Sequence, residues 1–430
     1  MEIGFTNAFY LTVNLLLYIT VFVIYQKKRG YMSVGSLYLL YLVITCVLAF
    51  VCFATPNIFY TFNDLTLFPF IYLFAALILT STPILRLDEK NTTIIQPSSR
   101  ALNLLCIFVI IVSLTQIVSI VRIFKDGMGT MIWDISSGSE LYHEMLSNAD
   151  DSGRSVSNIY AVISGSFSHL TILFVFIYLT REKPNYLIIA GLILCFALDM
   201  MSSIGNGARG NVVLKSMTVI FAYWLTRQWM TETVRKRVLA VLAGAIVIIA
   251  IPILMLTISR FSDHKGMDKA VTSSVIYYAG QSMLNFNNYG MDAGGIRYGD
   301  RTANLLKRVI DPTTPVNYIQ RRVKYSNLKI DDYYFYTFVG DFTLDYGPFW
   351  AMVIFILFTL LFLSLTKPKD GALTFQQLIA VYFVLCVCCQ GVLCLFSFSD
   401  TDGGLKIITT ILTYLYFKFD YMATNSIIKI

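Results

Sequence analysis

A glycine-rich turn that contains a single arginine lies between two long apolar runs, in the segment Gly-Asn-Gly-Ala-Arg-Gly at 205–210. The runs at 186–203 and 211–230 are each long enough to cross a bilayer, so we expect Arg209 where the membrane meets water. Glycine lets the backbone approach a ligand closely, and a guanidinium matches the oxygens of a phosphate in pairs. The alternative role is an interfacial anchor for the helix. The turn therefore indicates a site for an anionic ligand that a lipid carries.

Further arginines that suit phosphate recognition lie in two long polar segments, at 122–158 and 259–336. The first segment is acidic on balance and the second is basic. Phosphates outside the membrane are chiefly lipid head groups and polyprenyl carriers, because no nucleotide pool is available there. Together with Arg209, the candidate pyrophosphate-binding residues are Arg154, Arg260, Arg297, Arg308 and Arg322.

Tyrosines and side-chain amides crowd the same basic segment and predict a surface for sugars. Aromatic faces stack on the C–H faces of sugars, and amides bind their hydroxyl groups. The candidate sugar-binding residues are Tyr278, Gln281, Asn285 and Asn288. The alternative is that many of the tyrosines form the aromatic belt at the membrane interface.

Three residues are candidates for the acid–base step, namely Asp199, Asp341 and His264. Asp199 lies inside an apolar run, where a charge normally has a partner or a task, and it either pairs with Lys215 or an arginine or acts as a base. Asp341 and Asp345 are four residues apart, which places them on one face of a helix, where they could orient arginines or accept a proton. His169 is the remaining ambiguous group, either a core histidine or a proton carrier.

The composition identifies the elements that must position these residues. Of the 430 residues, 56% are hydrophobic and only 14% are charged, whereas soluble domains carry about 25% charged residues. The mean hydropathy is +0.66, and several uninterrupted apolar stretches have the length of a membrane-spanning helix. The sequence therefore predicts an all-α polytopic integral membrane protein.

We predict about eleven transmembrane helices from these stretches. Their approximate bounds are 7–25, 35–54, 66–85, 101–121, 159–180, 186–203, 211–230, 238–258, 347–366, 374–396 and 405–419. Lysines and arginines of the short loops fall in alternate loops, which the positive-inside rule places in the cytoplasm. The N-terminus is then outside, the C-terminus inside, and the turn at Arg209 outside.

The two long polar segments both fall on the outer side. The chain has no internal repeat and no second soluble domain, so we expect residues 1–430 to form a single membrane domain. Its first outer loop is 122–158, and a large basic outer loop at 259–336 joins spans 8 and 9. Helical spacing at 274–289 and 302–310 predicts re-entrant or interfacial helices within the large loop.

Several functions are disfavoured. The basic residues are scattered among aspartates and lie in the wrong compartment for nucleic acid. The histidines lack the spacing of metal ligands, and no phosphate-cradling P-loop or nucleophilic-serine elbow is present. All eight cysteines lie within apolar runs, so we expect neither disulfides nor a metal site. We expect no cofactor.

With this layout, the chain resembles the bacterial oligosaccharide repeat-unit polymerases, the Wzy-type O-antigen and capsule polymerases. Gly207-Ala208-Arg209-Gly210 resembles the arginine–glycine element of the O-antigen polymerase and ligase superfamily. The segment 277–302 resembles the long-loop pattern of the family. The segment 335–347, which runs into an apolar span, resembles the end of that pattern. Arg154 and Gly165 fit the arginine–glycine spacing of outer loops in some members.

The resemblance implies a GT-C-like glycosyltransferase at the outer, periplasmic face of the bacterial inner membrane. It would transfer a growing glycan from undecaprenyl pyrophosphate to the non-reducing end of an incoming lipid-linked repeat unit, without a metal ion. Implied partners are the undecaprenyl-pyrophosphate-linked oligosaccharides, membrane lipids, a chain-length regulator and a flippase. Alternative functions are an O-antigen ligase of the same superfamily, a lipid-linked oligosaccharide flippase or transporter, and a non-catalytic membrane sensor.

Overall fold

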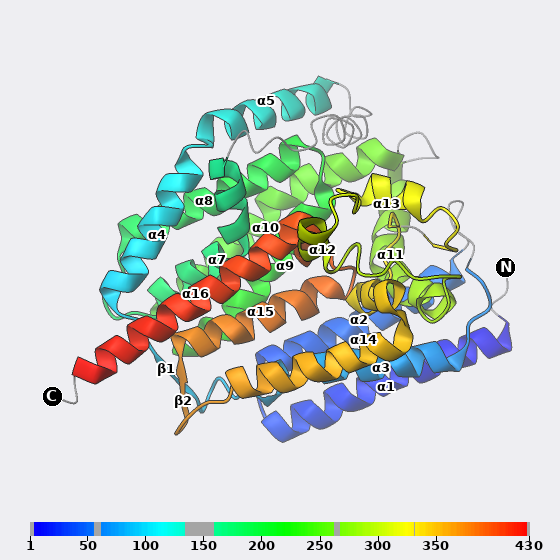
Figure 1. Cartoon of the computed structure of the whole chain (residues 1–430), viewed down its shortest axis with the longest axis horizontal. Coiled ribbons are helices and arrows are strands. Elements are labelled where there is room, and N and C mark those ends of the chain that lie inside the picture. Colours follow the sequence, from blue (N-terminus) through cyan, green and yellow to red (C-terminus); the bar gives the residue numbers. More distant parts are fainter. Residues whose placement is uncertain (1–3, 56–61, 134–158, 262–266, 331, 428–430) are drawn as a thin grey trace. The chain divides into compact units, whose positions relative to one another are not determined.

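The computed structural model describes residues 4–55, 62–133, 159–261, 267–330 and 332–427. Within α5, α9, α10, α11 and α16, some residues are described by their backbone alone, and Arg209 is one of them. The described chain is nearly all α-helical, as the composition predicts (Figure 1). The strands found within it are β1 (Thr93–Ile95) and β2 (Ala372–Thr374), which pair in parallel.

Six described helices are long and apolar enough to cross a membrane, which confirms a multi-pass membrane protein. They are α1 (Phe5–Arg29), α2 (Val34–Ala54), α3 (Leu67–Arg86), α7 (Ile159–Leu179), α8 (Tyr186–Gly205) and α14 (Thr337–Leu365). A seventh span results if α4 (Ser99–Leu114) and α5 (Ile117–Trp133), bent by 51° at their junction, cross as one. Because α5 continues to Trp133, the first part of the expected outer loop at 122–158 is helical.

The other four predicted spans coincide with helices that do not pass the same test of length and hydropathy. These are α9 (Arg209–Thr226), α10 (Glu232–Phe261), α15 (Phe375–Gly391) and α16 (Asp400–Ile427). α15 is apolar but has only 17 residues. α9 carries Arg209 and Lys215, and α16 carries aspartates in its first turn. The count of eleven spans thus stays a prediction.

The chain divides into two compact units, and unit 1 consists of Met1–Thr92, Val275–Gly371 and Ala380–Ile407. Within it, α1 packs against α2 and α3, and α3 packs along α14. Buried aromatic and aliphatic side chains fill these contacts, including Tyr18, whose ring lies 5.1 Å from that of Phe74. Unit 1 also holds the end of α11 (Met267–Asn285), the π-helix η3 (Phe286–Gly290), α12 (Asn304–Ile310), α13 (Tyr318–Lys324) and the short turn η4 (Phe396–Phe398).

Unit 2 consists of Thr93–Ser274, Ala372–Ile379 and Ile408–Ile430. Its helices α4, α7, α8 and α9 pack on one another, α10 packs on α9, and η1 (Arg227–Trp229) follows α9. α5 crosses α8 with the backbones of Gly127 and Gly205 in direct contact, and a Cβ on either glycine would collide with the opposite backbone. The strand pair β1–β2 lies in this unit as well.

A break in α14 determines where the candidate site lies. Gly347 has φ 78° and ψ 159°, which is not helical, and Pro348 follows it. From Gly347 to Leu365 a helix rises about 28 Å at about 1.5 Å per residue, close to the thickness of the hydrocarbon core. Phe349 and Trp350, just past the break, are exposed, as is typical of side chains at a membrane interface. We therefore place Thr337–Tyr346 outside the hydrocarbon core.

Candidate functional site

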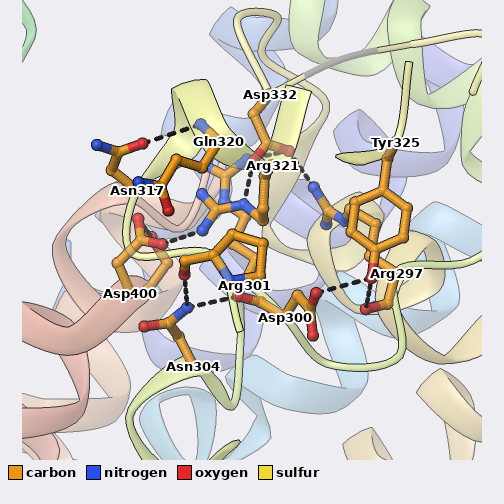
Figure 2. Close-up of polar contacts among 12 residues, drawn as sticks. Arg297, Asp300, Arg301, Asn304, Asn317, Gln320, Arg321, Tyr325, Asp332 and Asp400 are labelled. Carbon is orange, nitrogen blue, oxygen red and sulfur yellow. Dashed lines mark hydrogen bonds and ion pairs between the residues drawn. The ribbon is translucent and has the colours of Figure 1, made fainter. Parts of the chain in front are cut away.

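Three buried arginines and four aspartates form an ionic cluster at the first part of α14, Thr337–Tyr346. We call it the arginine network, and its members are Arg297, Arg301, Arg321, Asp332, Asp341, Asp345 and Asp400. Each arginine side chain is at most 3% exposed, and Tyr336 is buried among them. Figure 2 shows that the polar groups come from three places: the segment 297–304, α13 with the residues after it, and the start of α16.

Arg297 is held on three sides by groups of the chain. Its Nε lies 2.8 Å from Oδ1 of Asp345, and its Nη1 contacts Asp332. Its Nη2 donates to the backbone carbonyl of Asp341 at 3.0 Å. The guanidinium is therefore fixed in position and direction, and α14 supplies most of its acceptors.

Arg301 and Arg321 extend the cluster toward α16. Arg301 lies 3.0 Å from the carboxylate of Asp341 and donates to the hydroxyl of Tyr336 at 2.8 Å. Arg321 contacts Asp332 through Nε and Asp400 through Nη1. Asp332 is thus shared by all three arginines, which makes it the centre of the network.

A second carboxylate, that of Asp300, collects further cations beside the network. Its side chain is fully buried and contacts Lys307 of α12 and Lys324 of α13, the latter at 2.7 Å. The hydroxyl of Tyr325 donates to it at 2.7 Å. Asp300 therefore joins α12 to α13, and these two short helices border the arginine network.

Backbone strain marks the same region. Four non-glycine residues among those described have positive φ, and three of them adjoin the network: Tyr298 (54°), Thr337 (65°) and Asp400 (59°). This conformation is a genuine outlier for a β-branched threonine. Thr337 is held in place because its N–H donates to the carbonyl of Leu393 at 2.9 Å. Strained positions that the surroundings over-determine are concentrated at functional sites, which supports a functional role for this region.

Neighbouring cations lower the pKa of two of these carboxylates, those of Asp332 and Asp300. Burial opposes the charge of Asp332, but Arg297, Arg301 and Arg321 together hold its pKa well below the ordinary value. Asp300 follows the same logic, since burial opposes its charge while contacts with Lys307, Lys324 and Tyr325 lower its pKa. Cations and carboxylates are equal in number across both clusters, so their interior carries no excess charge for a ligand. Binding of an anion must then use the edge of the network.

At that edge, next to the start of α16, two buried guanidinium nitrogens lack a hydrogen-bond partner among the described residues. Arg308 donates from Nη1 to the hydroxyl of Thr401 at 3.0 Å, while its Nε is buried and has no hydrogen-bond partner among the described residues. Arg321 binds Asp400, and its Nη2 likewise has no hydrogen-bond partner within the described part of the chain. A buried donor without a partner is costly, and a phosphate oxygen would satisfy it.

The predicted pyrophosphate-binding residues are only partly brought together. Arg297 lies inside the network, Arg308 at its edge, and Arg322 is exposed, with its guanidinium 5.7 Å from the ring centre of Tyr333. Arg209 begins α9 in unit 2, and Arg260 lies in α10; both are described by backbone alone. Arg154 lies outside the described residues.

The predicted acid–base residues are in different environments. Asp341 is fully buried: it faces Arg301, and its Oδ2 accepts from the N–H of Leu395 at 2.8 Å. Asp199 pairs with Lys215 of α9 at 2.8 Å, the structural alternative in the sequence analysis. His264 lies outside the described residues. His169 is buried in α7, with Nε2 2.7 Å from the hydroxyl of Thr410.

The predicted sugar-binding amides are bonded within the chain. Buried Gln281 accepts from the hydroxyl of Tyr277 at 2.8 Å, and Asn285 donates to the carbonyl of Phe335 at 2.9 Å. Asn288 accepts from the backbone N–H of Asn63 at 3.0 Å. Tyr278 packs edge-on against Phe335 with ring centres 5.4 Å apart. These amides thereby fasten η3 and the end of α11 to neighbouring segments.

The residues that complete the site were not among the candidates predicted from the sequence; they are Asp300, Arg301, Arg321, Asp332, Tyr336 and Asp400. Arg301 lies four residues after Arg297, and this spacing, like that of Asp341 and Asp345, could have suggested a paired set. No comparable signal links Asp332 or Asp400 to them, because their contacts with Arg321 cross 11 and 79 residues.

Among the described residues, no group of three or more His, Cys, Asp or Glu side chains could hold a metal ion. The eight cysteines are buried as free thiols. No family model, curated protein or solved structure matches the chain.

Proposed function

We propose that the chain is a membrane glycosyltransferase, a polymerase of lipid-linked oligosaccharide repeat units. It transfers a growing glycan from undecaprenyl pyrophosphate to the non-reducing end of an incoming unit. One observation carries the proposal: Arg308 and Arg321 each have a buried guanidinium nitrogen without a hydrogen-bond partner among the described residues. The two arginines contact Thr401 and Asp400, which are adjacent in the first turn of α16. The sequence resemblance described above agrees with it.

The proposed role of these arginines follows from where charge develops. The acceptor hydroxyl oxygen attacks the anomeric carbon of the donor, and the bond from that carbon to the pyrophosphate oxygen breaks. The hydroxyl proton passes to a base, and negative charge grows on the departing pyrophosphate. Donors that are already in place stabilise such charge without having to reorganise. Arg308 and Arg321 supply two such donors, and exposed Arg322 adds a third cation nearby in the chain.

The interior of the arginine network has a positioning role in this proposal. Arg297 and Arg301 are bound by carboxylates and by Tyr336, and in this proposal they hold Arg321 and α14 in place. Asp341 orients Arg301 from α14. Asp199 and His264 stay candidates for the proton acceptor. The finer assignments of a GT-C-like fold, eleven spans and a periplasmic site at the bacterial inner membrane belong to the same proposal.

The test is elongation of lipid-linked repeat units by the purified chain in liposomes, without nucleotide sugar and with EDTA present. We expect the wild type to produce a ladder of glycans and Arg308→Ala to lose about 10²–10³-fold in rate, as for loss of a transition-state donor. Lys329→Ala is the matched control, because Lys329 is an exposed cation of the same segment that pairs with Asp292.

Each alternative gives a different result in this assay. A ligase would transfer single units to another acceptor without a ladder, and a transporter would move units across the bilayer with no new glycosidic bond. Wild-type elongation by Arg308→Ala would remove this residue from the site. Loss of activity in EDTA would contradict the metal-free mechanism.

A further inference from the structure

The short helix α12 exposes a continuous apolar face. Leu306, Val309 and Ile310 are 67%, 78% and 84% exposed, and their spacing of three and four residues places them on one side of the helix. The other side of α12 is fixed to the protein. Asn304 and Arg308 bind Thr401, and Leu305 packs against Gly404 in the first turn of α16. The apolar face is thus held outward by a rigid attachment.

The contacts of α12 place it at the level of the membrane interface. The residues just before it reach α14 next to its break, where Thr302 contacts Asp345 at 2.7 Å and the hydroxyl of Tyr346 at 3.1 Å. Tyr346 directly precedes the break at Gly347, and exposed Trp350 lies just past it in the chain. Because tryptophan gathers where lipid meets water, α12 begins close to the head groups of the outer leaflet.

Basic residues border the apolar face. Lys307 and Arg308 belong to α12, and α13, joined to it through Asp300, presents Arg322 and Lys324 beside Val323, which is 75% exposed. A short helical surface with exposed aliphatic residues and neighbouring cations matches the surface of a bilayer, where acyl chains lie beneath anionic head groups. A water-facing loop has no such need for exposed aliphatic side chains.

We propose that α12 docks into the outer leaflet of the membrane in which the chain is embedded, with Leu306, Val309 and Ile310 among the acyl chains. This contact fixes the short helices that border the arginine network relative to the bilayer surface. It does not depend on the proposed enzymatic function, because the partner is the bilayer itself. A second copy of the chain and the polyprenyl tail of a lipid-linked ligand are the competing occupants.

The test uses spin labels on the full-length chain in liposomes of phosphatidylethanolamine and phosphatidylglycerol that contain no polyprenyl lipid. The labelled variants are Val309→Cys, Ile310→Cys and the control Ser326→Cys, which is exposed between polar neighbours. The native cysteines are buried, and the wild-type chain provides the labelling blank. Accessibility to oxygen, which concentrates in acyl chains, is compared with accessibility to a water-soluble nickel chelate.

We expect oxygen to relax the labels at 309 and 310 several-fold more than the chelate does, and the label at 326 to show the reverse. Equal access of the chelate to 310 and 326 would show that α12 faces water, which overturns the proposal. Protection of 310 from both reagents would indicate a second copy of the chain. If the labels became more accessible to oxygen only after undecaprenyl phosphate is added, the apolar face would bind the ligand tail. Protection from both reagents and this dependence on undecaprenyl phosphate would each overturn the proposal.

Discussion

Two of the clusters of charged side chains in the described part of unit 1 differ in construction. One is the arginine network. The other, which we call the α1–α3 joint, connects the ends of the first three helices and consists of Arg29, Tyr31, Asp88 and Glu89. In the joint, Arg29 pairs with Asp88 at 3.0 Å, and Glu89 accepts from the N–H of Val34 at 2.6 Å.

The groups of the α1–α3 joint complete helix ends. Glu89 takes an N–H at the start of α2, and Arg29 donates to the carbonyl of Leu85 near the end of α3 at 2.7 Å. Such contacts satisfy backbone groups that a helix terminus leaves open. The residues involved also have ordinary backbone conformations, since none of them is among the residues with positive φ.

In the arginine network, the arginines and aspartates mostly pair with one another and do not complete helix ends. Residues with strained backbone lie at its border. Buried ion pairs are weak evidence for stability, because the desolvation cost of the charges can exceed their attraction. A cluster that is costly and strained, and that has buried guanidinium nitrogens without partners at Arg321 and at neighbouring Arg308, is therefore better explained by function than by stability. The number of ion pairs therefore does not identify a site, whereas buried hydrogen-bond donors without partners and strained backbone do.

The largest expected difference between the clusters is the effect of removing one arginine. Arg301→Ala leaves the buried carboxylate of Asp341 without its nearest cation, and we expect a loss of about 3–5 kcal/mol in the free energy of unfolding. Arg29→Ala in the joint removes contacts that are partly exposed, and we expect about 1–3 kcal/mol. Denaturant unfolding in detergent, followed by tryptophan fluorescence, measures both.

A double variant separates the cost of an unpaired charge from the value of the pair. Arg301→Met with Asp341→Leu removes both charges and is expected to recover part of the stability lost in Arg301→Ala. Equal losses for Arg301→Ala and Arg29→Ala would mean that the two clusters do not differ in energetic construction.

A smaller effect concerns the opposite pH dependence of one carboxylate in each cluster, Glu89 in the joint and Asp332 in the network. Burial raises the pKa of Glu89 above 4.5, so the folded chain binds this proton more readily than the unfolded chain. Its contribution to stability therefore increases as pH falls toward 4.5 and is lost as pH rises through the raised pKa. Asp332 has a lowered pKa, so its contribution is complete above 3.8 and is lost only as pH falls through the folded value.

The measurement is the unfolding midpoint between pH 7 and pH 5 for the wild type and for Glu89→Gln. We expect the wild type to gain stability relative to Glu89→Gln as the pH is lowered, and Asp332 to contribute no slope in this range. A network that loosens between pH 7 and pH 5 would contradict the lowered pKa of Asp332.

The elements could be predicted from the sequence, because periodicity and apolar length are local properties. Helices were predicted at 274–289 and 302–310, and the structure has α11 with η3 and α12 there. The helix predicted to carry Asp341 and Asp345 is α14. The pairing of charges could not be predicted, because it depends on the path of a loop without periodicity. Arg322 was a candidate, yet its neighbour Arg321 is the buried one, because consecutive side chains point about 100° apart around a helix.

The smallest expected effect is that of replacing Asp199 in unit 2 by asparagine. This variant tests whether Asp199 only pairs with Lys215 or accepts a proton in catalysis. Asp199 and Lys215 form a single ion pair whose side chains are 30% and 23% exposed, and Lys215 also donates to the hydroxyl of Ser203 at 2.7 Å. Partly exposed single pairs contribute about 0–1 kcal/mol, so Asp199→Asn should shift the unfolding midpoint little. If the carboxylate only holds Lys215, glycan elongation should also persist, because an amide oxygen can still accept from the lysine. A stable Asp199→Asn chain that no longer elongates glycans would instead identify Asp199 as the proton acceptor, and Lys215→Met, which spares the carboxylate, should then keep more activity than Asp199→Asn.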